Sequence, residues 1–142
     1  MYRKIMTHRK HIAAAIALFI MSVGCGGLRG EFAFKKEGEN TYRRVEGNPE
    51  YSASETINWV FVFKSPGENR TVGVALMKKG LVWSDVEIRT ETINDARSIL
   101  YGAIANLEPG GYKLVIMSKH RVIGEKEFTI YDESREEDLQ FE

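Results

Sequence analysis

Hydrophobic and polar residues alternate along most of the chain from residue 56 to residue 131, the pattern of β-strands that bury one face. The strongest example is the run INWVFVFK at 57–64. We expect strands within residues 31–36, 56–64, 71–77, 81–90, 98–107, 113–119 and 122–131, separated by turn-forming residues. Short strands at nearly regular spacing predict an all-β fold, an antiparallel sandwich or barrel of about six or seven strands.

The expected strand at 81–90 carries a tryptophan among alternating apolar residues. Val82, Val86 and Ile88 share one parity, and we expect these side chains to face the core. Trp83 has the opposite parity, which predicts an outer-face position and makes it a candidate interface residue. The alternatives are that Trp83 lies beneath the polar loop expected at 37–55, or that a bulge turns it inward. The charged residues expected on the same outer face are Asp85, Glu87 and Arg89.

The segment 98–107 contains alanines that would suit a helix, but its β-branched and aromatic residues and Gly102 favour a strand. It is followed by Leu-Glu-Pro-Gly-Gly-Tyr at 107–112. This string resembles the turn before the penultimate strand of immunoglobulin-like and fibronectin type III-like domains, within a resemblance that covers about 75 residues. The resemblance implies an immunoglobulin-like β-sandwich without the cysteine pair of antibody domains. It also implies that Pro109 and Gly110 form the bend and that Tyr112 is a structural corner, its hydroxyl bonded to the backbone a few residues upstream.

The N-terminal 24 residues differ from the rest of the chain. Basic residues precede an uncharged apolar stretch at 12–23, and a small residue, Gly24, follows it. This order is typical of a secretory signal peptide, which we expect to be helical. The apolar stretch is well short of the ~20 residues that a transmembrane helix needs.

Cys25 directly follows Gly24 and is the only cysteine in the chain. The local sequence resembles a bacterial lipoprotein signal, in which the cysteine is lipidated and becomes the mature N-terminus; Ser22 departs from the leucine usual at that position. The alternative is an ordinary cleaved signal peptide with an incidental cysteine. Gly26 after the cysteine resembles the pattern sorted to the outer membrane. We therefore expect a lipid-anchored protein of the bacterial cell envelope, at the outer membrane.

These features divide the chain into four parts. We expect a lipoprotein signal peptide at 1–24, a lipidated cysteine with a flexible tether and polar segment at 25–55, a β-sandwich domain at 56–131 and an acidic tail at 132–142. The chain has 20 basic and 20 acidic residues, and 1–24 contains four basic and no acidic ones, so the mature part carries a net charge of −4. No concentrated basic face suggests a nucleic-acid partner.

In a meandering strand order, alternate loops gather at one end of a sandwich. That end would hold the loops 64–70, 92–97 and 119–121, with the acidic tail leaving from the other end. The basic residues expected there are Lys64, Arg70, Arg97, Lys119 and Arg121. Such an end would suit an anionic lipid surface, a glycan or an acidic protein. The alternative is that these are simply solvated loops.

The sequence offers little catalytic chemistry. His120 is the only histidine after Gly24 and lies between two basic residues, which disfavour the imidazolium that a general base must form. We predict no catalytic residues, no metal site and no cofactor. The expected function is a non-enzymatic binding or accessory module, held to the membrane by its lipid anchor, with a protein or glycan partner. The alternatives are a structural subunit of an envelope assembly, with a free edge strand for sheet addition, and a small periplasmic enzyme.

Overall fold

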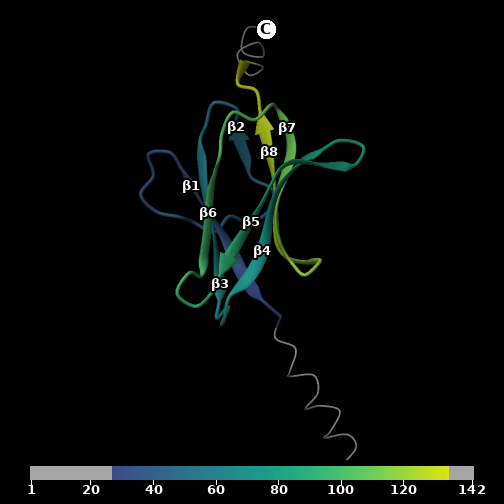
Figure 1. Ribbon diagram of the computed structural model, residues 1–142. Helices are drawn as coiled ribbons and strands as arrows, with labels where there is room; N and C mark the ends of the chain where they lie inside the picture. The colour runs from purple at the N-terminus through teal and green to yellow at the C-terminus, as the bar shows by residue number, and fades with distance from the viewer. Residues whose placement is uncertain (1–26, 135–142) are drawn as a thin grey trace, which may run out of the picture.

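The computed structural model describes residues 27–134, so the signal-peptide helix expected at 1–24 and most of the acidic tail lie outside the described residues. The described part is built from strands (Figure 1). These are β1 (Arg29–Lys36), β2 (Glu50–Ser52), β3 (Ile57–Lys64), β4 (Arg70–Lys79), β5 (Trp83–Ile93), β6 (Ile99–Ile104), β7 (Gly110–Ser118) and β8 (Arg121–Tyr131).

The strands form two sheets that pack face to face. One sheet has the order β1-β3-β6 and the other the order β2-β8-β7-β4-β5. Neighbouring strands are antiparallel except for β2 and β8, which are parallel. This is the predicted all-β immunoglobulin-like sandwich. It has eight strands instead of six or seven, because the polar segment expected to be a loop contributes β2.

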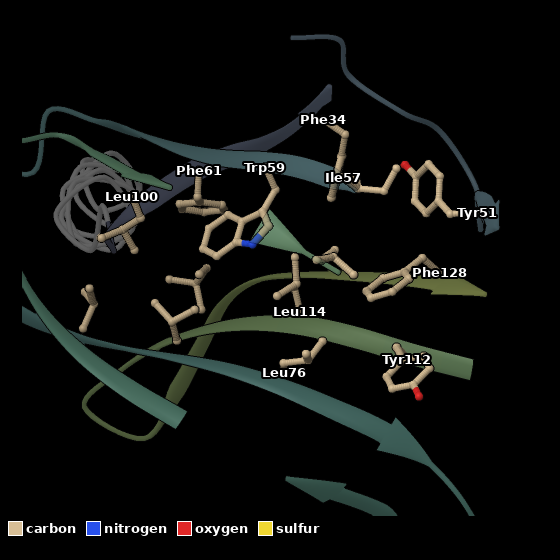
Figure 2. Close-up of a cluster of buried hydrophobic side chains, with 14 of the residues drawn as sticks. Phe34, Tyr51, Ile57, Trp59, Phe61, Leu76, Leu100, Tyr112, Leu114 and Phe128 are labelled. Atoms are coloured by element: carbon tan, nitrogen blue, oxygen red, sulfur yellow. The ribbon is translucent and has the colours of Figure 1, made fainter. Parts of the chain in front are cut away.

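The core lies between the sheets and follows the predicted alternation of β3 (Figure 2). Ile57, Trp59, Phe61 and Phe63 point inward from β3, each at most 4% exposed. Opposite them lie apolar residues of the larger sheet, including Val72, Val74, Leu76, Leu114, Ile116, Phe128 and Ile130. Full burial of one such side chain stabilises a fold by about 1.5–3 kcal/mol.

The folded domain begins earlier than the predicted boundary at residue 56. Strand β1 pairs with β3 along its whole length, from Arg29–Lys64 to Lys36–Ile57. Gly30, expected to be part of the flexible tether, is a residue of β1 beside the Phe61 ring, and a Cβ there would overlap the ring. Phe34 is buried in the core. The segment 29–52 therefore belongs to the sandwich, because its alternating apolar residues pack into the core.

The segment expected to be a strand or a helix at 98–107 forms β6, which pairs with β3. At the following turn the Tyr112 hydroxyl donates a hydrogen bond of 2.7 Å to the backbone carbonyl of Glu108. Tyr112 is 2% exposed and stacks on Phe128 with ring centroids 5.7 Å apart. Gly110 has φ 149°, a conformation that favours glycine. These contacts are those of a corner tyrosine in an immunoglobulin-like domain.

The predicted orientation of β5 is wrong. Val82, Val86 and Ile88, expected in the core, are 76%, 49% and 59% exposed. The register between β4 and β5 shifts at Leu76/Met77, where the pairing passes from Glu87 to Asp85 and leaves Val86 in a bulge. Asp85 and Glu87 therefore lie on opposite faces of the sheet, whereas alternation placed both on the outer face.

Charged residues occupy the inner face of β5. Glu87, Arg89 and Glu91 pair with Leu76, Val74 and Val72, which point into the core. The physical reason is that β5 is the edge strand of a five-stranded sheet facing a three-stranded one. An edge strand at the open side of the sandwich has no complete apolar surface opposite it, so charged side chains there still reach water.

Candidate functional site

The β4–β5 hairpin extends from the sandwich (Figure 1). The side chains at its tip are apolar. Leu81 is fully exposed and Val82 is 76% exposed, and Lys79 pairs with Trp83 at the base of the turn. A soluble domain gains nothing from exposing two adjacent aliphatic side chains, so such a tip marks a candidate contact surface.

Trp83 lies on the outer face of the larger sheet and is half-buried. The Lys113 ammonium is 4.4 Å from the centroid of its ring, and the Lys79 ammonium is 6.0 Å from it. Both lysines thus make cation–π contacts with the indole. Trp83 has the outer-face position expected from the sequence. Its charged neighbours are not the expected ones, because Glu87 and Arg89 lie on the inner face and Lys79 and Lys113 contact the ring instead.

Further apolar side chains follow the hairpin across the same sheet face. The register places Ile88 opposite Ala75 and Ala75 opposite Val115. Ala75 and Val115 are nearly covered by their neighbours, whereas Ile88 remains 59% exposed. We use the term hairpin face for the surface made by Leu81, Val82, Trp83, Val86 and Ile88. The parity argument missed most of it, because a bulge cannot be read from alternation alone.

The loops expected to gather at one end of the sandwich do so. The pairs Arg29–Lys64, Arg70–Ile93 and Ser118–Arg121 lie at this end, whereas Lys79–Trp83 and Gly110–Ile130 lie at the other. In Figure 1 the β3–β4, β5–β6 and β7–β8 turns are at the bottom, and β8 ends at the top. The basic residues brought to this end are Arg29, Lys64, Arg70, Arg97, Lys119 and Arg121. We call it the basic end.

Some of these cations are neutralised within the domain. Lys64 lies 3.5 Å from Glu31, which also pairs with Arg44, and Arg97 lies 3.2 Å from Glu91. The Arg44 and Lys64 side chains hold the pKa of Glu31 below its ordinary value. Within residues 27–134, no hydrogen bond or ion pair engages the side chains of the exposed residues Arg29, Arg70, Lys119 and Arg121. The sequence analysis missed Arg29, because it assigned this residue to the tether.

The β7–β8 turn holds two of these basic residues in an unusual backbone. Lys119 and His120 have φ values of 48° and 65°. Two consecutive positive φ values describe a type I′ hairpin turn, a position where asparagine and glycine are normally favoured. The turn therefore exposes a lysine and a histidine at the tip of the basic end, at some cost in backbone strain.

Two hollows in the domain are smaller than a typical substrate pocket. A crevice of about 40 Å³ lies between the sheets beside Trp59, Glu87, Arg89 and Gly102. The Arg89 guanidinium lies 5.4 Å from the Trp59 ring and donates to the Tyr101 carbonyl at 2.5 Å. A shallow groove of about 230 Å³ runs between β1 and β8. Pockets for small molecules usually measure about 300–1,000 Å³.

The other predictions for the site concern chemistry at the N-terminus and metal binding. Cys25 lies outside the described residues, so its expected lipidation stays a prediction. Among residues 27–134, no three His, Cys, Asp or Glu side chains are grouped as a metal site. Within the same part of the chain, no helix combines the length and the apolar character that crossing a membrane requires.

Comparisons with known proteins identify no family for the chain. No protein-family model matches it, and no curated protein matches its sequence. Among solved structures, it is similar to an immunoglobulin-like protein from Pseudomonas aeruginosa at 13% sequence identity and a TM-score of 0.45. The match covers 75% of this chain and 93% of that one.

Proposed function

We propose that this chain is a lipid-anchored protein of the bacterial cell envelope that acts as a non-enzymatic binding module. The anchor is Cys25, acylated after removal of residues 1–24, and the Gly26 that follows it favours the outer membrane. The binding surface is the hairpin face. The single observation that carries the binding role is the exposure of Leu81 and Val82 beside Trp83, because an aromatic residue next to exposed aliphatic ones is typical of an interface centre.

The chemistry of the hairpin face favours a protein partner. Trp83 is flanked by the ammonium groups of Lys79 and Lys113. An apolar tip with lysines around it fits an apolar pocket with carboxylates on its rim. We therefore assign the hairpin face to a protein partner with an acidic rim.

An enzyme is the less favoured alternative. The crevice between the sheets is about 40 Å³ and partly filled by Arg89, and the groove between β1 and β8 is shallow. Neither hollow has the size of an ordinary substrate site. Among the described residues, the projecting hairpin is therefore a better candidate site than either hollow.

A structural subunit that extends its sheet is the second alternative. Strand β5 offers a long free edge, which is what strand addition would need. Its inner face carries Glu87, Arg89 and Glu91, however, and inward charges on an edge strand oppose pairing with another chain. This observation places the subunit role behind the binding role.

Intact-mass analysis of the membrane-extracted protein tests the anchor. We expect the mass of residues 25–142 plus acyl chains, and loss of both the lipid and membrane retention in Cys25→Ala. An unmodified mass starting elsewhere than Cys25 would overturn the anchor.

Site-specific photo-crosslinking in intact cells tests the binding surface. A photoreactive phenylalanine analogue at position 82 is expected to capture a discrete protein. The matched control has the same analogue at Ile99, which is on the other sheet and 47% exposed, and it should not capture that protein. Mass spectrometry should place the crosslink beside Asp or Glu residues of the partner, and Leu81→Ser should abolish it. Equal capture from positions 82 and 99, or capture that Leu81→Ser leaves unchanged, would contradict the assignment.

A further inference from the structure

The basic end and the point where the chain enters the domain lie together. Strand β1 begins at Arg29, and Arg29 pairs with Lys64 at the basic end. Only residues 26–28 separate Arg29 from Cys25. Four residue steps span at most about 14 Å even when fully extended. A lipid on Cys25 would therefore keep the basic end close to the membrane surface.

Three of the four cations without partners, all except Arg70, lie on the side of this end where the chain enters. Gly30 and Gly124 approach the same ring of Phe61 from β1 and β8, so the start of β1 lies beside the start of β8. Arg29 immediately precedes Gly30, and the β7–β8 turn with Lys119 and Arg121 leads into β8. Arg29, Lys119 and Arg121 thus lie on neighbouring elements next to the entry point of the tether.

The acidic residue next to the tether, Glu31, is paired with Arg44 and Lys64, and the other acidic residues of this end lie in different loops. Glu68 belongs to the β3–β4 loop and Asp95 to the β5–β6 loop. The Asp95 carboxylate accepts a hydrogen bond of 2.8 Å from the Gly67 amide, and the Asp95 amide donates to the Gly67 carbonyl at 2.9 Å. The side next to the tether therefore carries the excess of positive charge.

We propose that the basic end rests on anionic phospholipid headgroups and holds the domain upright on the membrane, with the hairpin face directed away from it. The proposal rests on the lipid anchor at Cys25. Attraction between basic side chains and an anionic surface decays over about 8 Å at physiological salt. The short tether keeps Arg29, Lys119 and Arg121 near that range. A few basic side chains are then sufficient to hold the basic end on the membrane, because the lipid already keeps the domain close to it.

The contact also gives a role to the strained turn. Lys119 and His120 adopt positive φ values that asparagine or glycine would adopt more easily. The two residues form the tip of the β7–β8 turn, and both side chains are exposed. A turn of glycine and asparagine would relieve the strain and remove the lysine from the membrane surface.

The test uses the chain 25–142 coupled through Cys25 to a maleimide lipid in preformed vesicles. Because Cys25 is the only cysteine, coupling is specific and does not depend on lipidation in cells. Vesicles of phosphatidylcholine that contain phosphatidylglycerol as the anionic lipid are compared with vesicles of phosphatidylcholine alone. A water-soluble acetylating ester then labels the lysines, and mass spectrometry measures the rate at Lys119 and at Lys79, which is exposed at the far end.

We expect Lys119 to react about fivefold more slowly on the anionic vesicles, whereas the rate at Lys79 should be unchanged. High salt should remove the difference at Lys119. Arg121→Gln should reduce the protection about fivefold, since each basic residue near an anionic surface contributes about that factor. The matched control is Arg43→Gln, an exposed arginine outside the basic end.

Equal rates at Lys119 on the two vesicles, or protection of Lys79 instead, would overturn the proposal. So would an equal effect of Arg121→Gln and Arg43→Gln. If only the lipid anchor is wrong, protein from cells would have an unmodified mass, but Lys119 would still be protected on the anionic vesicles.

Discussion

The indole of Trp59 lies directly against the backbone of Gly102, its partner on β6. A Cβ at Gly102 would come within 2.8 Å of three atoms of the indole, a separation at which the ring has to move. Trp59 is 3% exposed and contacts Arg89 across the crevice, so the ring has little room to move. The glycine therefore makes room for the largest side chain of the core.

Gly102→Ala is expected to destabilise the domain by about 1–3 kcal/mol, the usual cost of overpacking a core. Gly73→Ala on β4 is the matched control, because a Cβ there meets nothing closer than 3.9 Å. Chemical denaturation of both variants measures the difference. Equal free energies of unfolding for the two variants would show that Trp59 is not confined as described.

A second pair couples β8 to the core. A Cβ at Gly124 would lie 2.5 Å from a ring carbon of Phe61. We expect Gly124→Ala to destabilise the wild-type domain and to cost at least about 1 kcal/mol less in a Phe61→Leu background, where the ring is absent. A double-mutant cycle from urea unfolding measures this coupling. Additive effects would contradict the contact.

Tyr112→Phe removes the hydroxyl that donates to the Glu108 carbonyl. We expect a loss of about 1 kcal/mol in the free energy of unfolding, the usual net value of such a bond. Tyr101→Phe is the control, because the Tyr101 side chain is 69% exposed and its hydroxyl makes no hydrogen bond within the described part of the chain. A cost equal to that of Tyr101→Phe would mean that the corner bond contributes nothing.

Glu55 links acid stability to the turn after β2. Burial raises the pKa of Glu55, but hydrogen bonds from the Ser52 amide at 2.7 Å and from Lys36 at 3.0 Å outweigh burial and lower the pKa below its ordinary value of 4.5. A lowered pKa contributes stability that is fully present above the unfolded value and is lost as the pH falls through the folded one.

Glu55→Gln should therefore reduce the free energy of unfolding by about 1 kcal/mol at neutral pH. The difference from wild type should disappear as the pH falls below 4.5. Urea titrations across this pH range measure it, with Glu50→Gln on an exposed position of β2 as the control for loss of a charge. A pH-independent difference would contradict the linkage.

The sequence was informative wherever a strand has a complete core opposite it. The alternation of Ile57, Trp59, Phe61 and Phe63 correctly predicted the inner face of β3, and the Pro-Gly-x-Tyr string pointed to the bend at Tyr112. Local composition is enough in such places, because burial on one face and a tight turn leave few choices.

Alternation failed on β5 for a physical reason. Val82, Val86 and Ile88 are apolar and alternate in part, yet the bulge at Val86 and the edge position of β5 direct them outward. The bulge depends on the exact pairing of β5 with β4, which alternation does not specify, and the edge position depends on the other strands of the sandwich, which are distant in sequence. The hairpin face was hidden from the sequence analysis for the same reason, apart from Trp83.

The charged inner row of β5 has a consequence for a protein confined to a plane. Tethered molecules meet their neighbours side by side and at a far higher effective concentration than molecules in solution. An uncovered sheet edge would then let adjacent copies zip together into ribbons. Glu87, Arg89 and Glu91 make that joining costly, because their charges would be trapped at the seam. With the lipid anchor proposed at Cys25, copies would accumulate densely on one membrane and remain separate, each with its hairpin free.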